Sequence, residues 1–272
     1  MSFLAAVCQM TSTSDAEANL AQAEALVRGA AARGAALVAT PENTNYLGPH
    51  AEKVRRAEPL DGPTCARFAA LAAELRVHLL LGSFNEKAPE RGRCFNSSVL
   101  FGPRGERLGV YRKLHLFDVD VPGGVSFRES DSVAPGSEVV VVESPIARLG
   151  LSICYDLRFG ELYRALVGRG AEVLTIPSAF TAATGKAHWE VLVRARAIEC
   201  QAYVLAPGQV GRHDDGGLRE SHGQSMIVDP WGQVLAQVPD GVGIAVAEID
   251  LARVARVRSA IPVARHRRPE LA

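Results

Sequence analysis

The chain has 272 residues, 47% of them hydrophobic, which is enough apolar material for one large core. Lysine and arginine together number 30, as do aspartate and glutamate, and this zero formal net charge excludes a basic nucleic-acid-binding surface and a cationic membrane-binding surface. Five scattered cysteines without a CxxC pair exclude a disulfide framework, and the absence of a signal-peptide pattern or a membrane-length apolar run predicts a cytoplasmic protein that binds neither membranes nor nucleic acids.

The first part of the chain predicts a strand, a helix and a second strand. Residues 3–9 are apolar and strand-like. Ser14 and Glu17 fit a capping box at the start of a helix, and Gly34 is placed to end that helix. Residues 35–39 form a short apolar run that is typical of a buried strand. This order is typical of a βαβ unit, so we expect a largely parallel sheet.

Two charged residues follow predicted strands in this half of the chain. Glu42 lies just past the strand at 35–39. The segments 95–101 and 107–113 predict a hairpin whose second strand ends at Lys113. Most glutamates and lysines in such places are solvated surface charges, so neither residue alone indicates a site.

A long loop is predicted at residues 118–136. Loops of this length inside a compact domain are usually either functional or disordered. We single out Glu129 in this loop as a candidate site carboxylate, although an isolated loop glutamate is ordinarily an exposed charge. Its role therefore depends on the partners that the fold brings to it.

Residues 147–162, ARLGLSICYDLRFGEL, predict a buried strand that ends at Cys154, a turn, and a helix. The cysteine therefore stands at the carboxyl end of a strand and just before the amino terminus of a helix. Open α/β sheets bind ligands at that edge, and helix amides there favour a thiolate. The alternative is that Cys154 is only a small buried apolar residue, which is the commoner role of a lone cysteine.

The remaining segments complete one domain, which we place at residues 1–272. Residues 208–217 contain glycines, His213 and two aspartates and are typical of a surface loop. No linker, repeat or low-complexity tract divides the chain. The other predicted strands are 77–84, 139–142, 172–176, 202–206, 225–228, 233–238 and 243–249. The main predicted helices in the second half of the chain are 159–169, 186–200 and 251–257.

Three titratable residues thus lie at or just past strand ends, and in a parallel-rich sheet such ends share one edge. Cys154 would supply a nucleophile, activated by a nearby ammonium and a helix terminus. Glu42 would take the thiol proton and later activate water. Lys113, together with the backbone N–H of Tyr155, would stabilise the oxyanion of a tetrahedral intermediate. These are the parts that acyl transfer requires.

Motifs for cofactors and metals are missing from the sequence. No GxGxxG follows a strand, and there is neither a GxxxxGK[ST] phosphate loop nor an HExxH helix. His115, His188 and His222 lack the spacing of metal ligands. We therefore predict an enzyme that uses neither a cofactor nor a metal.

Three segments around the candidate residues form a recognisable set of motifs: 41–43 (PEN), 111–116 (YRKLHL) and 150–159 (GLSICYDLRF). With them, and over nearly its whole length, the chain resembles the nitrilase, or carbon–nitrogen hydrolase, superfamily. The resemblance implies a single-domain α/β fold built as a four-layer α-β-β-α sandwich, and a homodimer or larger homo-oligomer formed through helices. It also implies Cys154 as nucleophile, Glu42 as general base and Lys113 as transition-state cation, with Glu129 as a second glutamate that positions the lysine and the substrate amide.

Further segments narrow the resemblance, among them 177–180 (PSAF), 187–190 (AHWE) and 194–199 (RARAIE). With these the chain looks like the Nit branch of that superfamily. The resemblance is greatest to deaminated-glutathione amidases, which implies hydrolysis of a small carboxylate-bearing amide through a thioester on the cysteine. The ω-amidases, which act on α-ketoglutaramate and succinamate, share most of these motifs and remain an alternative. A catalytically silent binding protein on the same fold is a second alternative, which the intact Glu42, Lys113 and Cys154 disfavour.

A substrate-binding set follows from the same resemblance. Arg158 and Phe180 match positions that hold the acid end of the substrate. From the residues alone, Arg158 is equally compatible with a surface arginine paired with Asp156 or Glu161. The full predicted set is Tyr155, Arg158, Phe180, Thr181 and Thr184.

Overall fold

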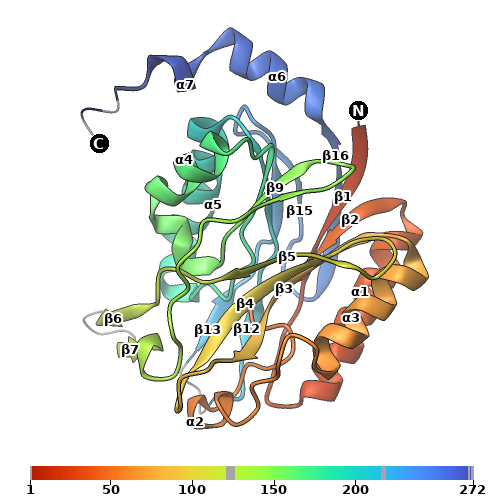
Figure 1. Cartoon of the computed structure of the whole chain (residues 1–272), viewed down its shortest axis with the longest axis vertical. Helices are drawn as coiled ribbons and strands as arrows, with labels where there is room; N and C mark the ends of the chain where they lie inside the picture. The colour runs from red at the N-terminus through yellow and green to blue at the C-terminus, as the bar shows by residue number, and fades with distance from the viewer. Residues whose placement is uncertain (1, 121–125, 216–218, 269, 271–272) are drawn as a thin grey trace.

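Two six-stranded sheets face each other in the middle of the molecule (Figure 1). This computed structural model describes residues 2–120, 126–215, 219–268 and 270. The first sheet, in spatial order, consists of β16 (Gly243–Asp250), β1 (Ser2–Gln9), β2 (Ala35–Ala39), β3 (His78–Lys87), β4 (Cys94–Phe101) and β5 (Arg107–Arg112). The second consists of β15 (Val234–Gln237), β14 (Met226–Val228), β11 (Tyr203–Ala206), β10 (Val173–Thr175), β9 (Arg148–Leu151) and β8 (Val141–Glu143).

Helices cover the outer face of each sheet. Two of them, α1 (Ala16–Ala32) and α3 (Pro63–Leu75), pack on the first sheet, and α4 (Gly160–Gly168) and α5 (Ala182–Cys200) pack on the second. The predicted four-layer α-β-β-α sandwich is therefore confirmed. Helices α6 (Leu251–Ala260) and α7 (Val263–His266) run across the top of the molecule (Figure 1).

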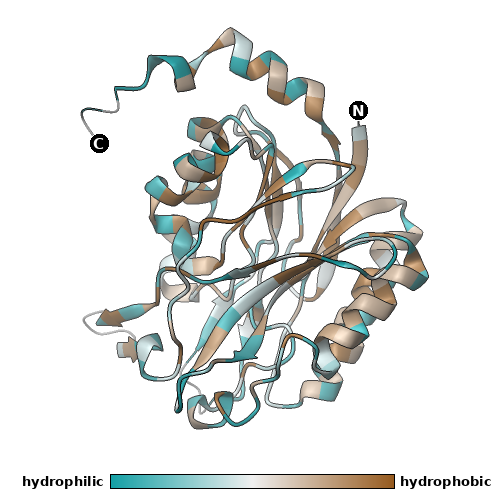
Figure 2. Cartoon of the chain, viewed as in Figure 1, coloured by the Kyte–Doolittle hydropathy of each residue, from teal (hydrophilic) through white to brown (hydrophobic). Residues whose placement is uncertain are grey.

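Alternation along the strands explains the two apolar layers. On β3, Leu79 and Leu81 pack with the residues under α1 and α3, whereas Leu80 belongs to the core between the sheets. All three side chains are fully buried, as expected for a strand covered on both faces. Figure 2 shows the same arrangement, with brown strands inside and teal residues concentrated on outer surfaces and loops.

The central strands of each sheet are parallel and the outer ones antiparallel. β1, β2 and β3 run parallel, as do β9, β10 and β11.

The βαβ prediction for the first strands is confirmed, but Ser14 does not cap α1. Asp15 caps it instead and accepts from the Ala18 N–H at 3.0 Å.

Two segments predicted as loops contain paired strands. Within 118–136, β6 (Asp118–Asp120) pairs with β7 (Ser126–Arg128), and a short 3-10 helix, η1 (Glu129–Asp131), follows; residues 121–125 lie outside the described residues. In the second segment, β12 (Val210–Arg212) pairs with β13 (Glu220–His222), and residues 216–218 lie outside the described residues.

The surface-loop interpretation of 208–217 was wrong for His213, whose ring finds internal partners, whereas Arg212 and Asp214 are exposed. His213 is only 5% exposed. Its ring nitrogens lie 2.8 Å from the carbonyl oxygen of Ser12 and 2.8 Å from the Ser221 hydroxyl. These contacts attach the segment to the residues that follow β1.

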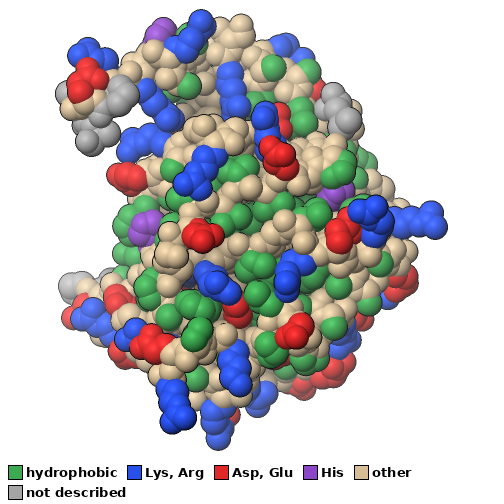
Figure 3. All heavy atoms as spheres, viewed as in Figure 1, with side chains coloured by type: hydrophobic (Ala, Val, Ile, Leu, Met, Phe, Trp, Pro, Cys, Tyr) green, Lys and Arg blue, Asp and Glu red, His purple; other side chains and the backbone are tan. Residues whose placement is uncertain are grey.

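The face of the molecule in Figure 3 carries positive and negative side chains interspersed, without a patch of one sign. This distribution agrees with the zero net charge of the sequence. Among the described helices, none is both long enough and apolar enough to cross a lipid bilayer.

A buried aspartate connects the two sheets. Asp156 is fully buried and accepts a 2.7 Å hydrogen bond from the Tyr111 hydroxyl of β5. It also accepts from the backbone N–H of His115 at 3.0 Å and from that of Ile153 at 2.9 Å. Tyr111 and His115 lie on either side of Lys113 at the edge of the first sheet, and Ile153 follows β9 of the second. The Asp156 carboxylate therefore holds the segment around Lys113 against the segment that precedes Cys154.

Replacing Asp156 with alanine is expected to destabilise the fold by about 3 kcal/mol or more, because it leaves several buried donors without an acceptor. Urea denaturation followed by circular dichroism measures this change. The matched control is Asp61→Ala, at an exposed position before α3, where we expect a change within about 0.5 kcal/mol. Equal stability of the two variants would contradict the structural role of Asp156.

Candidate active site

The three predicted catalytic residues meet between the sheets. Glu42 follows β2 and Lys113 follows β5, both in the first sheet, whereas Cys154 follows β9 in the second. The expectation that they share one edge of a single sheet was therefore wrong. The sandwich places the carboxyl ends of strands from both sheets around one pocket, so the residues approach each other across the interface.

A glycine allows these strand ends to approach closely. A Cβ atom on Gly82 of β3 would lie 1.8 Å from the carbonyl oxygen of Thr40 and 2.7 Å from Pro177. Thr40 precedes Glu42 by two residues, and the Pro177 carbonyl accepts from the Cys154 N–H at 2.9 Å. Any side chain at position 82 would thus displace the segments that carry Glu42 and Cys154.

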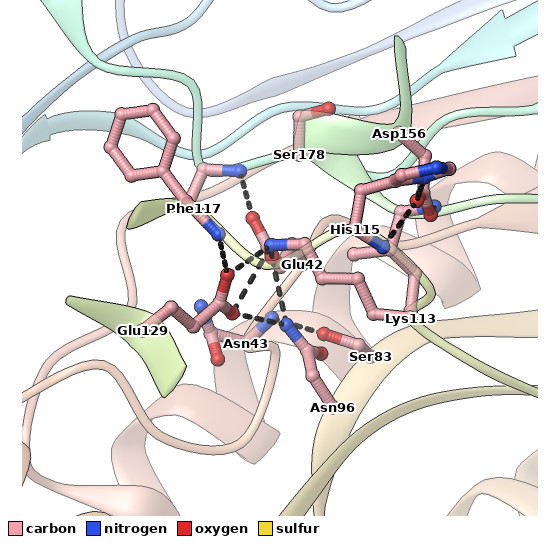
Figure 4. Close-up of polar contacts among 12 residues, drawn as sticks. Glu42, Asn43, Ser83, Asn96, Lys113, His115, Phe117, Glu129, Asp156 and Ser178 are labelled. Atoms are coloured by element: carbon pink, nitrogen blue, oxygen red, sulfur yellow. Dashed lines mark hydrogen bonds and ion pairs between the residues drawn. The ribbon is translucent and has the colours of Figure 1, made fainter. Parts of the chain in front are cut away.

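Lys113 lies between two carboxylates (Figure 4). Its Nζ is 3.0 Å from Glu42 Oε1 and 2.9 Å from Glu129 Oε2. All three residues are at most 4% exposed. Asn96, inside β4, donates to Glu42 Oε1 at 2.8 Å.

Backbone amides complete the coordination of both carboxylates. The Ala179 N–H donates to Glu42 Oε2 at 2.8 Å, and the Phe117 N–H donates to Glu129 Oε2 at 2.7 Å (Figure 4). Fixed donors of this kind hold each carboxylate in one orientation. Glu42 therefore keeps a defined position beside the thiol, and Glu129 keeps a defined position beside the lysine.

The charges in this network stabilise one another. Burial alone would lower the pKa of Lys113, but Glu129 and then Glu42 hold it well above its ordinary value. Burial alone would raise the pKa of Glu129, but the charges of Lys113 and then Lys53, together with the Phe117 N–H, lower it. The lysine is therefore an ammonium and Glu129 a carboxylate at neutral pH.

Cys154 adopts a conformation that ends the strand. Its φ is +48°, in the left-handed region, and the cysteine opens the 3-10 helix η2 (Cys154–Arg158). The prediction that the strand includes Cys154 was wrong: β9 ends at Leu151, the backbone stays extended as far as Ile153, and the positive φ turns the chain at Cys154. A non-glycine residue held at positive φ is strained, and such strain is common at active sites.

The thiol of Cys154 rests in its protonated form. Burial raises its pKa well above the ordinary value, and the negative charge of Glu42 raises it further, whereas Lys113 only partly opposes them. The expectation that the lysine and the helix terminus favour a resting thiolate is therefore contradicted. A thiol in this form must lose its proton before or while its sulfur attacks, and the Glu42 side chain faces it.

All nine predicted site residues line one pocket. Arg158 is partnered neither with Asp156 nor with Glu161; its guanidinium lies 3.3 Å from His188 Nδ1 and 5.2 Å from the Phe180 ring centroid. The four catalytic candidates are Glu42, Lys113, Glu129 and Cys154, and the substrate-binding candidates are Tyr155, Arg158, Phe180, Thr181 and Thr184.

Sequence reasoning missed several residues of this site. Asn96 could have been found, because Asn96, Ser97 and Ser98 interrupt an otherwise apolar predicted strand with buried polar groups. The others lie in segments without a periodic pattern, and only their positions in space identify them. They are Asn43, Lys53, Phe117, Phe127, Ala179 and Arg219.

No group of three histidine, cysteine, aspartate or glutamate side chains suited to a metal ion occurs among residues 2–120, 126–215, 219–268 and 270. The polar atoms of the catalytic network are instead used on one another. The chemistry that this arrangement supports is nucleophilic attack by a thiol, assisted by a carboxylate and an ammonium.

The model of the carbon-nitrogen hydrolase family matches residues 4–259. The chain belongs to the carbon–nitrogen hydrolase family. A protein named deaminated glutathione amidase from Bos taurus is 45% identical over 98% of this chain and 83% of its own length. One with the same name from Synechocystis sp. is 44% identical over 97% of this chain and 98% of its own length. The predicted activity class, an amidase, is confirmed.

Solved structures of this family share the fold. The Caenorhabditis elegans NitFhit protein is 42% identical, with a TM-score of 0.93 over 100% of this chain and 66% of that one. Saccharomyces cerevisiae Nit3, described as a member of branch 10 of the nitrilase superfamily, is 28% identical, with a TM-score of 0.87 over 98% of this chain and 97% of its own. The predicted Nit-branch resemblance is confirmed.

Glu42→Gln is expected to lower kcat by about 10²–10⁴, because the amide cannot accept the thiol proton. The same change should lower the pKa of Cys154, since it removes the negative charge that opposes the thiolate. Steady-state kinetics measure the first effect, and a titration of thiolate absorbance near 240 nm measures the second.

Subtraction of the same titration on Cys154→Ala isolates Cys154 from the other four cysteines. Undiminished turnover in Glu42→Gln, or a thiolate already formed at pH 7 in the unmodified protein, would contradict this assignment of the base.

Proposed function

We propose that the protein hydrolyses the amide bond of deaminated glutathione through a thioester on Cys154, with Glu42 as general base and Lys113 as oxyanion stabiliser. One observation carries the proposal: a buried thiol, a carboxylate and an ammonium line the same pocket and interact with one another. The relatives named deaminated glutathione amidase support the choice of substrate.

In the first half-reaction the Cys154 sulfur attacks the amide carbonyl while its proton passes to Glu42. The carbonyl oxygen becomes an oxyanion, which the Lys113 ammonium and the backbone N–H of Tyr155 stabilise. Glu42 then gives the proton to the amide nitrogen, the C–N bond breaks, and the amine leaves. The acyl group remains bound to sulfur as a thioester.

Water enters the second half-reaction as the nucleophile. Glu42 accepts a proton from the water as its oxygen attacks the thioester carbonyl, and the oxyanion forms again beside Lys113. The C–S bond then breaks, the acid is released, and the proton returns from Glu42 to the Cys154 sulfur. Glu129 keeps the lysine in place through both halves by its 2.9 Å contact.

Arg158 is the proposed partner for the carboxylate of the acyl half. It is half-buried at the pocket wall, over the Phe180 ring, and its hydrogen-bond partner among the described residues is His188. A guanidinium in this position keeps N–H groups free for a bidentate contact with a carboxylate. Thr181 and Thr184, whose hydroxyls are 2.9 Å apart, border the same end of the pocket.

The ω-amidase reaction on α-ketoglutaramate uses the same acyl half and the same steps, with ammonia as the leaving group. The two substrates differ only on the amine side of the scissile bond. The ratio of their kcat/KM values therefore decides between the two functions. A higher value for deaminated glutathione supports the proposal, and a higher value for α-ketoglutaramate overturns it.

Intact-mass spectra of enzyme quenched during turnover of deaminated glutathione are expected to show the mass of one ketoglutaryl group added to the chain. The adduct should be absent in Cys154→Ala, which should also lose activity while keeping its circular dichroism spectrum. Full activity in Cys154→Ala would overturn the thioester mechanism.

We further propose that the protein is a cytoplasmic homodimer. Five free cysteines suit a reducing compartment. The outer face of α5 exposes Val191 and Ile198, at 67% and 49%, and Trp231 on a neighbouring loop is 56% exposed. That loop is held to α5 by a 2.8 Å bond from Arg194 to the Gly232 carbonyl, so the three apolar side chains form one surface.

Light scattering is expected to give the mass of a dimer, and Val191→Glu should shift it toward the monomer, because a charge would be buried in the interface. Val242→Glu is the control, since Val242 is 48% exposed on the turn before β16. A monomer in the unmodified protein would contradict the proposed dimer.

A further inference from the structure

His188 on α5 contacts Arg158 from outside the pocket and has no role in the mechanism above. Its Nδ1 lies 3.3 Å from Arg158 Nη1 and 3.4 Å from Arg158 Nη2. Arg158 lines the pocket, whereas His188 is exposed and is not among the described lining residues. Any effect of His188 on a bound substrate must therefore pass through the arginine.

The arginine determines which nitrogen of His188 carries the proton. A guanidinium is always protonated and offers only N–H donors, so His188 Nδ1 must be the acceptor. A neutral imidazole has one accepting nitrogen, which places its proton on Nε2. The imidazole in this contact is therefore neutral, and it leaves the positive charge of Arg158 uncancelled.

Arg219, which also lines the pocket, has a partner of the opposite kind. It forms an ion pair with the buried carboxylate of Asp215. Such a pair fixes a guanidinium, but it also occupies N–H groups and cancels the charge that a second anion would meet. A neutral acceptor, in contrast, orients the guanidinium of Arg158 and leaves its full charge to a substrate carboxylate.

The contact with His188 also leaves one edge of the guanidinium free. His188 Nδ1 faces the end of the group between Nη1 and Nη2. The neighbouring edge, between Nε and Nη2, carries two parallel N–H groups, which match the two oxygens of a carboxylate. Among the described residues, no hydrogen bond uses Nε of Arg158.

Two aromatic rings hold the guanidinium without orienting it. Its Cζ lies 5.2 Å from the Phe180 ring centroid and 6.0 Å from the Tyr155 ring centroid. Cation–π contacts keep a guanidinium close to the rings, but they allow it to turn over them. The acceptor of His188 restrains this remaining freedom, because turning the group would break the hydrogen bond.

Helix α5 supports the ring beside the arginine as well. Trp189, which follows His188 in the chain, is 1% exposed and packs against Phe180 at 5.3 Å between ring centroids. Its indole N–H donates to the Gln224 carbonyl at 2.8 Å, which holds the indole in place. Two consecutive residues of α5 thus support the guanidinium and the ring on which it rests.

We propose that His188 is a positioning residue, which orients the Arg158 guanidinium toward the carboxylate of the acyl half and leaves its charge intact. His188 does not contact the substrate, so its effect is on the recognition of that carboxylate rather than on the chemistry at Cys154. This inference rests on the proposed function, because Arg158 is assigned to the acyl carboxylate there.

The test compares deaminated glutathione with 4-oxopentanoyl-cysteinylglycine, in which a methyl group replaces the carboxylate of the acyl half. The two share the scissile amide and the leaving group, so the ratio of their kcat/KM values measures recognition of that carboxylate. We expect the unmodified protein to prefer the carboxylate by at least about tenfold. His188→Leu removes the acceptor and should lower this ratio by about three- to tenfold, as the loss of one hydrogen bond implies.

His188→Asn is the conservative variant, because the asparagine side-chain oxygen can take the place of the imidazole Nδ1, and it should keep most of the ratio. His188→Glu introduces a carboxylate that competes with the substrate for Arg158, so it should lower the ratio more than leucine does. Lys186→Leu is the matched control, at an exposed position of α5 outside the pocket lining, and it should leave the ratio unchanged.

An unchanged ratio in His188→Leu, or a fall by the same factor on both substrates, would overturn the positioning role. A ratio in His188→Asn as low as that in His188→Leu would also overturn it, because the acceptor would then have no effect. Equal hydrolysis of the two substrates by the unmodified protein would remove the carboxylate-binding role of Arg158, and that of His188 with it, while the thioester mechanism stands. Failure of the unmodified protein to hydrolyse either substrate would overturn the proposed function itself.

Discussion

The structure depends on one buried ammonium placed between two buried carboxylates. Moving three charges out of water is costly, and the cost is offset only when geometry and hydrogen bonds are nearly ideal. Lys113 reaches both glutamates within 3.1 Å, and Asn96 and two backbone amides satisfy remaining carboxylate oxygens. The strands and loops that supply these donors must therefore be held rigidly, and the sandwich provides that rigidity.

Two residues, Gly82 and Asp156, fix the relative positions of the segments that carry Glu42, Lys113 and Cys154. Gly82 removes the side chain that would otherwise separate the segment before Glu42 from Pro177, whose carbonyl holds the Cys154 backbone. Asp156 collects donors from both sides of Lys113 and from the residue before Cys154. The positions of Glu42, Lys113 and Cys154 are thus set by contacts between the two sheets, so fold and site are not separable parts of this molecule.

Local sequence patterns predicted most elements of the sandwich, because buried strands and amphipathic helices have distinct apolar periods. They did not predict that the catalytic residues come from two sheets, since a strand end looks the same in either one. The positive φ of Cys154 and the burial of Lys53 were also invisible, because both are imposed by distant segments. The burial of His213 was not predicted for the same reason. The glycines and aspartates around it are typical of an exposed loop, whereas its ring is hydrogen-bonded to Ser12 and Ser221.

The raised pKa of the nucleophile connects catalysis to substrate binding. A thiol that stays protonated at rest cannot react until a base accepts its proton, and in the proposed mechanism the Glu42 carboxylate beside it is that base. That carboxylate, with Glu129, leaves the catalytic network with a net charge of −1 despite Lys113. An anionic substrate would be repelled by such a centre unless cations outside the network attract it. The network that suits the chemistry therefore requires a separate cation for binding, and Arg158 lines the described pocket without a carboxylate partner among the described residues.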